Sequence, residues 1–371
     1  MKFAFCLIKY FQYGGLQRDF TRIANVCLGR GHEIDVYSAI WQGDKLPGIN
    51  VSILPTKGFA NHIQRESFIK NLSELLARKN YHAVVGFNKM PGLHVYFAAD
   101  PCFAEKAFSK SFFYRLTSRS KSNLRLEQAV FDKESFTQIL SISDRQKDLY
   151  MKHYHTPSER FHILPPGITK DRLIPPLPPE TRNQMRKELG IDVNHRVILM
   201  VGTGYQRKGV DRAILALSSL PSPLREQTHL LVIGENKLGP YQRLAKKSGV
   251  SNHVIFLGGR TDVPRFLAIS DILLHPARIE NTGTVLIEAM ASGLAVLATD
   301  ICGYGFHIVQ ADAGKLIPSP FHQKMLNMIL ADALTSDKIA RWQENGRKYI
   351  AKIDVFSLPE KAADVIEQTA S

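Results

Sequence analysis

Two glutamates in the segment 280–290, "ENTGTVLIEAM", have the residue type and spacing of a sugar-binding pair. A carboxylate accepts two hydroxyl hydrogen bonds, which is how the diol of a ribose or hexose is held. The small residues that follow Glu280 open a predicted helix, whose first N–H groups suit phosphate oxygens. Glu280 and Glu288 could therefore hold two sugars on either side of a diphosphate. The alternative of two surface acids is weaker, because Glu288 stands in the apolar run "VLIEAMASGLAVLAT", where an unpaired charge is costly.

A basic turn in the segment 201–214, "VGTGYQRKGVDRAI", supplies candidate cations for that diphosphate. Gly202 and Gly204 follow a predicted strand, and Arg207 and Lys208 come directly after them. Adjacent cations beside exposed backbone donors suit a diphosphate. The spacing is not that of a Walker loop. A solvated basic turn is the alternative interpretation.

Three further stretches place polar residues after predicted strands. In "YGGLQRD" (13–19), the glycines let the backbone approach a ligand, and Asp19 lies one turn into the next helix. An ordinary turn between a strand and a helix explains this stretch equally well. Arg260 follows another strand and could reach a ligand. His275 ends the next strand, and we interpret it as a buried core histidine.

The elements that must position these residues alternate between apolar strands and amphipathic helices. Strands are predicted within residues 3–8, 32–39, 49–55, 82–88, 196–202, 229–234, 253–259, 271–276 and 295–299, and helices over 16–31 and 66–79. This rhythm predicts an α/β fold with parallel, doubly wound sheets. Ligands of such sheets bind at the carboxyl ends of the strands.

A proline-rich stretch divides the chain of 371 residues into two predicted Rossmann-like domains that face each other across a cleft. Six prolines within 165–179 exclude a helix there and predict a stiff connection. We predict an N-terminal domain over 1–167, which faces the acceptor and the membrane, and a nucleotide-sugar-binding domain over 168–350. Residues 351–371 are expected to form a helix that packs back on the first domain.

Composition narrows the class of protein. The apolar run at the N-terminus is too short for a signal peptide, and no run is long enough for a membrane-spanning helix. The four cysteines form no Cys-x-x-Cys pair, which predicts reduced thiols, a cytoplasmic location and no zinc site. The net charge is +14, and residues 1–165 hold 23 Lys and Arg against 14 Asp and Glu. This surplus favours an anionic partner such as nucleic acid, a phosphorylated glycan or an anionic membrane.

The segment "HPARIENTGTVLIEAMASGLAVLATD" resembles the Glu-x7-Glu signature of retaining glycosyltransferases of family 4, which have the GT-B fold. The stretches "GLQRDFTRIA", "FNKMPGLHVYFAAD", "YRLTSR", "ILPPGI" and "RKGVDRAI" resemble a narrower family, the lipopolysaccharide core glucosyltransferases. The likeness runs through nearly the whole chain. It implies transfer of glucose from UDP-glucose to an inner-core heptose of lipopolysaccharide, in an α-1,3 linkage with retention.

The resemblance also implies roles for individual residues. Glu280 would contact the donor hexose, and Glu288 the ribose. The donor site it implies comprises Gly15, Asp19, Arg172, Arg207, Lys208, Arg260, Glu280, Thr282, Gly283, Thr284, Val285 and Glu288. As candidate catalytic residues we take Glu280, Asp19 and Asp100. The relatives differ at Gln12, Tyr13 and Gly204, none of which is a predicted charged donor contact.

The expected chemistry needs no metal and no other cofactor, because cations and helix N–H groups can neutralise the leaving diphosphate. No firm carboxylate nucleophile stands out in the sequence, so front-face substitution is preferred, with a donor phosphate oxygen taking the acceptor proton. Asp100 is the weaker alternative as a base or acceptor-positioning group. A sugar-nucleotide epimerase is the second candidate. A nucleic-acid-binding module is the third, but it leaves Glu280 and Glu288 unexplained, and we expect no nucleic-acid partner.

The segment from Lys106 to Arg125 combines cations with aromatic residues and contains no acid. Its predicted membrane-contacting residues are Lys106, Lys110, Phe112, Phe113, Arg115, Arg119, Lys121 and Arg125. This composition is typical of an interfacial helix, although aromatic residues that face the protein's own core would give a similar pattern. Because the implied acceptor is anchored in lipid, we predict a cytoplasmic enzyme that is peripheral on the inner face of the inner membrane.

Overall fold

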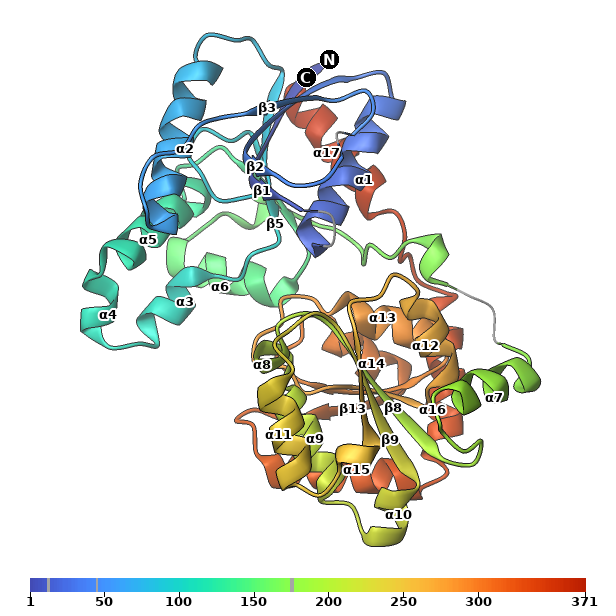
Figure 1. Cartoon of the computed structure of the whole chain (residues 1–371). Coiled ribbons are helices and arrows are strands. Elements are labelled where there is room, and N and C mark those ends of the chain that lie inside the picture. Colours follow the sequence, from blue (N-terminus) through green and yellow to red (C-terminus); the bar gives the residue numbers. More distant parts are fainter. Residues whose placement is uncertain (12–13, 45, 174–176) are drawn as a thin grey trace. The chain divides into compact units, whose positions relative to one another are not determined.

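The computed structural model describes residues 1–11, 14–44, 46–173 and 177–371. Gln12, Tyr13 and residues 174–176 of the proline-rich connection lie outside the described residues. The chain forms two compact units, residues 1–167 with 357–371 and residues 168–356 (Figure 1). The second unit extends to Phe356 and not to the predicted residue 350, because Val355 is buried in its core and accepts a backbone hydrogen bond from Ile168.

The first unit is built on a seven-stranded parallel sheet with the order β3-β2-β1-β4-β5-β6-β7. Its strands are β1 (Lys2–Tyr10), β2 (Glu33–Trp41), β3 (Asn50–Ile53), β4 (Ala83–Gly86), β5 (Val95–Ala98), β6 (Gln138–Ser141) and β7 (Phe161–Ile163). β1 is paired with β2 on one side, where Phe3 lies opposite Ile34, and with β4 on the other. The strand order therefore reverses between β1 and β4.

Helices cover both faces of this sheet, and each face packs its own apolar core. They are α1 (Gly15–Gly29), α2 (Asn61–Leu76), α3 (Phe103–Phe108), α4 (Phe112–Leu116), α5 (Ser118–Phe131), α6 (Asp144–Tyr154) and α17 (Leu358–Ala370). α2 begins at Asn61 and ends at Leu76, somewhat earlier than the predicted 66–79. Phe20 of α1 and Ile366 of α17 share one core, and Phe68 of α2 belongs to the other.

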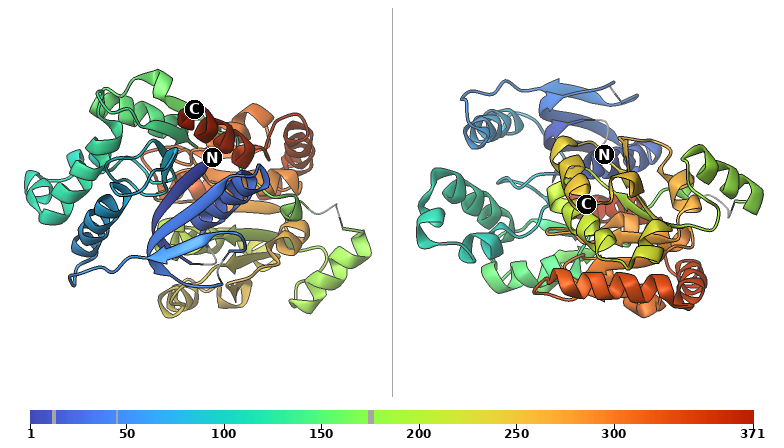
Figure 2. Two further views of the ribbon diagram at one scale, coloured as in Figure 1. Left: turned by 90° about the horizontal axis from the view of Figure 1, so that it is seen from above. Right: turned by 60° about the horizontal axis from the view of Figure 1, so that its bottom comes forward.

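The C-terminal helix α17 packs against α1, as the red and blue segments show (Figures 1 and 2). Arg30 forms ion pairs with Asp364 at 2.8 Å and with Glu367 at 2.9 Å. His32 Nε2 lies 2.7 Å from the same Glu367 carboxylate. The last residues of the chain thus complete the core of the first unit.

The second unit repeats the design with a six-stranded parallel sheet in the order β10-β9-β8-β11-β12-β13. Its strands are β8 (Arg196–Val201), β9 (Thr228–Ile233), β10 (Val254–Gly258), β11 (Ile272–His275), β12 (Ala295–Thr299) and β13 (Gly314–Ile317). Its helices include α7 (Pro179–Glu188), α8 (Tyr205–Lys208), α9 (Val210–Ser218), α11 (Gly239–Lys247), α12 (Val263–Ile269), α13 (Thr284–Ala291), α14 (Gly305–Ala311), α15 (Gln323–Thr335) and α16 (Lys338–Ile350). The strand order reverses between β8 and β11.

The predicted fold class, two doubly wound parallel α/β sheets, is confirmed by these two sheets. Every strand that the apolar pattern predicted is present. Four strands were not predicted, namely β5, β6, β7 and β13. None of them is longer than four residues.

The basic segment that resembles one interfacial helix is instead divided among α3, α4 and α5. Thr117 ends α4 in an extended conformation and caps α5, where its side chain accepts a hydrogen bond from the N–H of Ser120. A residue with extended backbone and a capping side chain interrupts a continuous helix. The aromatic residues therefore project from two short helices and not along one long face.

Candidate functional site

Two loops of the second unit meet at the carboxyl edge of its sheet, where the strand order reverses. Ligands of doubly wound sheets bind at this position. The loop after β8 leads into α8, which carries Arg207 and Lys208, and the loop after β11 carries Glu280. Gly209 has a φ of +77°, and a Cβ there would stand 2.1 Å from the carbonyl oxygen of Pro276. This glycine therefore allows the two loops to pack closely.

Lys208 and His275 converge on one oxygen of Glu280. The Lys208 ammonium donates to Glu280 Oε2, and His275 Nε2 lies 2.9 Å from the same atom. The Glu280 side chain is only 9% exposed, that of Lys208 is 12% exposed, and His275 is fully buried. The buried carboxylate is therefore satisfied through Oε2, which leaves Oε1 able to accept from a ligand hydroxyl.

The contacts fix the protonation state of this cluster. Burial favours the protonated carboxyl, but the His275 hydrogen bond and the Lys208 charge outweigh it and hold the pKa of Glu280 well below its usual value. Burial lowers the pKa of His275 despite the nearby carboxylate. Glu280 is thus an ionised acceptor, and a neutral His275 donates to it through Nε2. His275 is thus buried, as predicted, and is in addition a hydrogen-bond partner of Glu280.

The start of α13 lies directly beyond Glu280. Gly283 precedes the helix with a φ of +86°, a backbone conformation that glycine adopts without strain. The N–H groups of Thr284 and Val285 stand in the first turn, where a helix has no internal acceptor for them. Thr282 immediately precedes Gly283. This end of α13 is therefore suited to bind an anion.

Glu288 lies one turn further along α13 and is 4% exposed. A carboxylate so buried must be compensated by polar partners. Its burial excludes the alternative that Glu280 and Glu288 are two surface acids, since both side chains are enclosed. Glu280 thus precedes the start of α13 in the sequence, and Glu288 follows it within the helix.

The other predicted cations of this unit are placed differently. Arg207 is exposed on α8, and its backbone carbonyl accepts from the N–H of Arg278 at 2.8 Å. Arg260 pairs with Asp262 at 2.7 and 2.8 Å and stacks over the Phe266 ring. Arg172 lies in a short 3-10 helix, Lys170–Arg172, and no ion pair joins it to the described residues. Of these cations, Lys208 alone is joined to Glu280 in the described part of the chain.

Gly15, Asp19 and Asp100 belong to the first unit. Gly15 begins α1, and a Cβ there would meet open space. Asp19 lies 3.7 Å from Arg22, and burial raises its pKa to about 6 despite the neighbouring arginines. Asp100 follows β5 and is exposed, and its backbone carbonyl accepts from the Tyr150 hydroxyl at 2.8 Å. Gly204, where the relatives differ, caps α8 with a φ of +74°.

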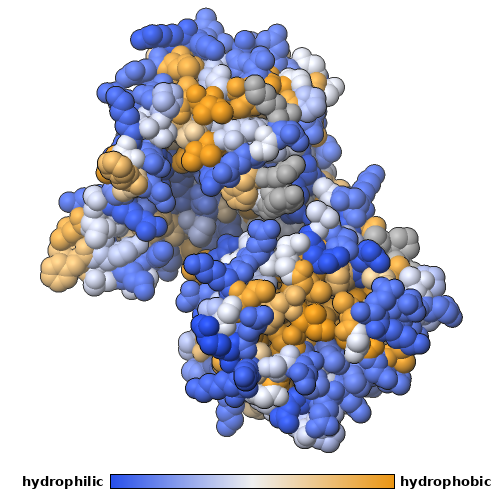
Figure 3. Space-filling view, in the orientation of Figure 1, coloured by the Kyte–Doolittle hydropathy of each residue, from blue (hydrophilic) through white to orange (hydrophobic). Residues whose placement is uncertain are grey.

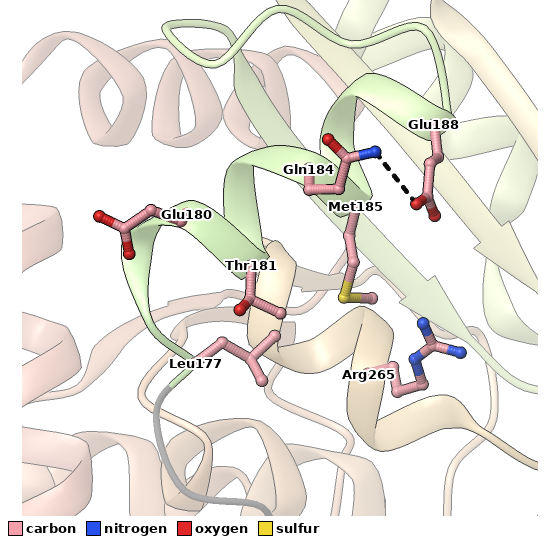
Figure 4. A pocket seen from close by; sticks show the side chains of 7 residues that line it. All are labelled: Leu177, Glu180, Thr181, Gln184, Met185, Glu188 and Arg265. Carbon is pink, nitrogen blue, oxygen red and sulfur yellow. Dashed lines mark hydrogen bonds between the residues drawn. The ribbon is translucent and has the colours of Figure 1, made fainter.

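A shallow hollow of about 490 Å³ lies elsewhere in the second unit, between α7 and α12 (Figure 4). Leu177 and Met185 line it from one side and Arg265 from the other. None of the residues predicted to bind the donor lines it. Within the described residues, no group of three His, Cys, Asp or Glu side chains is placed to hold a metal ion. Nor does any helix in the same residues have the length and apolarity needed to cross a bilayer.

Known proteins resemble this chain in sequence and in overall fold. Residues 181–349 match the family model "Glycosyl transferases group 1". The chain is 46% identical to the lipopolysaccharide glucosyltransferase WaaG of Escherichia coli strain K12 over 98% of both chains. The crystal structure of WaaG, a glycosyltransferase involved in lipopolysaccharide biosynthesis, superposes with a TM-score of 0.92 at 45% identity and covers 98% of this chain and 99% of that one.

A more distant structure shares the fold alone. The Anabaena protein HepE, in complex with UDP-glucose, matches with a TM-score of 0.75 at 19% identity, and the match covers 99% of this chain and 100% of that one. The likeness to WaaG, at 46% sequence identity and a TM-score of 0.92 over nearly the whole of both chains, is much stronger. This chain therefore belongs to the WaaG family of glycosyltransferases, which have the GT-B fold.

Proposed function

We propose that this protein transfers glucose from UDP-glucose to an inner-core heptose of lipopolysaccharide, in an α-1,3 linkage with retention of the anomeric configuration. The observation that carries the proposal is the buried, ionised Glu280, held by Lys208 and His275 next to the start of α13. The 46% identity to the WaaG glucosyltransferase over nearly the whole chain supports the choice of sugar and acceptor.

The donor would be bound mainly by groups of the second unit. Lys208, Arg207 and the N–H groups of Thr284 and Val285 neutralise the diphosphate. Glu280 accepts from a hexose hydroxyl through Oε1, and Glu288 accepts from the ribose. The proposed donor contacts also include Arg172 and Arg260, and Gly15 and Asp19 of the first unit would contact the donor sugar. A bound diphosphate would compete with Glu280 for Lys208, so binding and alignment of the carboxylate are coupled.

The chemical step would be front-face substitution. The bond between the anomeric carbon and the phosphate oxygen breaks, the acceptor hydroxyl adds to the same face, and a phosphate oxygen of the leaving UDP takes its proton. Lys208 and the helix N–H groups stabilise the charge that grows on UDP. Asp100 remains the weaker candidate for the base. No metal or other cofactor is needed in this scheme.

The acceptor is anchored in lipid, and we propose that α3–α5 bring the first unit to the anionic inner face of the inner membrane, from the cytoplasmic side. Phe108, Phe112, Phe113 and Leu116 are 55%, 60%, 78% and 47% exposed, which disfavours a role in the protein's own core. Six cations accompany them, each worth roughly 1 kcal/mol near an anionic surface. Arg125 pairs with Glu66, so its share is smaller.

Product analysis tests the proposed reaction. Incubation with UDP-glucose and a heptosylated acceptor should give UDP and a glucosylated acceptor, with an α-configured linkage by NMR. Conversion of UDP-glucose without acceptor into an epimeric sugar nucleotide would favour the epimerase. Failure to turn over any sugar nucleotide, together with salt-sensitive nucleic-acid binding, would favour the binding module.

Vesicle co-sedimentation tests the proposed docking. Arg115, Arg119, Lys121 and Arg125 changed together to Gln should weaken binding to anionic vesicles strongly. Equal binding of this variant and wild type, or no preference of wild type for anionic over neutral lipid, would show that α3–α5 do not dock the protein.

A further inference from the structure

An apolar projection outside α3–α5 stands at the start of α2. Phe59 has a relative exposure of 105%, which means that its ring makes almost no contact with the rest of the protein. Ile63, in the first turn of α2, is 48% exposed. Gly58 has a φ of +102°, and a Cβ there would stand 2.5 Å from Ile63 Cγ2. The loop is thus folded over Ile63 in a way that leaves the Phe59 ring in solvent.

Polar contacts fix this projection beside α5. His62 Nε2 lies 3.3 Å from Ser118 Oγ, at the first residue of α5. Arg65 donates to Ser122 Oγ at 2.9 Å and to Asn123 Oδ1 at 2.8 Å. Since Thr117 directly joins α4 to α5, the start of α2 lies next to the corner that carries Leu116 and the exposed α4 phenylalanines.

Both apolar groups lie at the same side of the first unit. In Figure 3, apolar side chains protrude at the left edge over α4 and again over the start of α2. Exposure of apolar side chains from two separate segments on one side of the unit is unfavourable in water and is typical of an interaction surface. The projection and the α4 residues thus form one discontinuous apolar rim.

The charge around this rim is mostly positive. Residues 56–65 contain Lys57 and Arg65 and no acid, and residues 106–126 contain six Lys and Arg and no acid. Glu66, the nearest acid along α2, is engaged by Arg125 and by the Ser122 hydroxyl. A mostly basic rim with protruding aromatic and aliphatic side chains fits an anionic bilayer, where the cations meet headgroups and the apolar groups enter the acyl boundary.

We infer that Phe59 and Ile63 form a second apolar anchor that inserts into an anionic lipid surface together with α4. The inference rests on the proposed docking of α3–α5 and extends it to a segment some fifty residues earlier in the chain. Two anchors on separate elements fix the orientation of the first unit on the membrane, whereas one anchor would leave it free to rotate about α4.

Site-specific probes test this inference directly. The native cysteines, Cys6, Cys27, Cys102 and Cys302, are all buried, so an introduced surface cysteine can be labelled selectively. Phe59→Cys, Phe113→Cys and Phe136→Cys would each carry an environment-sensitive fluorophore. Phe136 is the matched control, because it is 63% exposed but lies beyond the far end of α5, a helix of 14 residues.

With vesicles of phosphatidylglycerol and phosphatidylethanolamine, the probes at 59 and 113 should shift to the blue and be quenched by brominated lipid, and the probe at 136 should not. A response at 113 without one at 59 would overturn the inference and leave the docking of α3–α5 intact. No response at either position would overturn both. Equal responses at 59 and 136 would also overturn it, as non-specific adsorption.

Removal of the anchor gives a second test. Phe59→Ser with Ile63→Ser should lower the partition coefficient on anionic vesicles by about tenfold or more, since two apolar side chains lose their burial. Phe136→Ser should leave it unchanged. Transfer to a water-soluble acceptor should be the same in all three proteins. Unchanged partitioning of the double variant would contradict the second anchor.

Discussion

The carboxyl edges of the two sheets have the same topology but bury charge in different ways. In the second unit, Glu280 is enclosed, ionised and satisfied by Lys208 and His275. In the first unit, Asp19 is enclosed beside Arg22, yet burial raises its pKa to about 6. Sheets of the same topology thus accompany an enclosed carboxyl group in both units. The difference lies in the partners: Lys208 and His275 keep Glu280 ionised, whereas the arginines beside Asp19 do not offset its burial.

The largest effect should come from removal of the fixed anion. Glu280→Ala removes the hexose acceptor and leaves the Lys208 ammonium without its carboxylate, so we expect kcat to fall by about 100- to 1,000-fold. Steady-state transfer from UDP-glucose measures this. The change Glu344→Ala, at an exposed glutamate paired with Lys348, is the control and should be nearly silent.

The raised pKa of Asp19 predicts that the free energy of unfolding depends on pH. The unfolded chain releases the Asp19 proton near pH 3.9, whereas the folded protein holds it to about pH 6. Wild type therefore loses stability as pH rises through this window, by up to about 3 kcal/mol at roughly 1.4 kcal/mol per pKa unit. Asp19→Asn carries no such cost and should exceed wild type by up to that amount at pH 8.

Urea unfolding between pH 4.5 and 8 checks this prediction. The advantage of Asp19→Asn over wild type should shrink toward pH 4.5. An advantage of Asp19→Asn that stays constant with pH would mean that Asp19 keeps an ordinary pKa.

Substitution of the two adjacent cations of α8 should have effects of different size on donor binding and turnover. Lys208 is enclosed and pairs with Glu280, whereas Arg207 is exposed. We expect Lys208→Ala to weaken UDP and UDP-glucose alike and to lower kcat/KM by roughly 30- to 100-fold, and Arg207→Ala to cost only about tenfold. Calorimetry and kinetics on both variants check this. Full activity in the double alanine variant would refute the diphosphate cradle.

The smallest effect on the transfer rate should come from chelation of metal ions. If Lys208 and the start of α13 neutralise the leaving UDP, excess EDTA should change the rate by less than about twofold. Restoration of a lost activity by magnesium or manganese specifically would show that a metal ion carries that charge instead.

The sequence predicts every described strand longer than four residues, but among the shorter strands it predicts β3, β4 and β11 and misses β5, β6, β7 and β13. β1 and β8 are predicted by their unbroken apolar runs. β7 has three residues, and β13 begins with Gly314, where a Cβ would stand 1.8 Å from the carbonyl oxygen of Val296. Such strands are stabilised by their neighbours in the sheet rather than by local propensity, so no local pattern reveals them.

The candidate site is predictable by residue type but not by contact. The spacing of Glu280 and Glu288 and the pair Arg207 and Lys208 were visible in the sequence. The direct pairing of Lys208 with Glu280 joins residues 72 positions apart and depends on the reversal of strand order between β8 and β11. The sequence predicted that His275 is buried but not that it contacts Glu280, because a buried histidine can also make a hydrogen bond.

The split of roles between the two glutamates is the central claim, and calorimetric titration with UDP tests it most directly. UDP has a ribose and a diphosphate but no hexose. Glu280→Ala should therefore bind UDP within about threefold of wild type, while Glu288→Ala, which loses the ribose acceptor, should bind it at least tenfold more weakly. An equal loss of UDP affinity in both variants would contradict the claim.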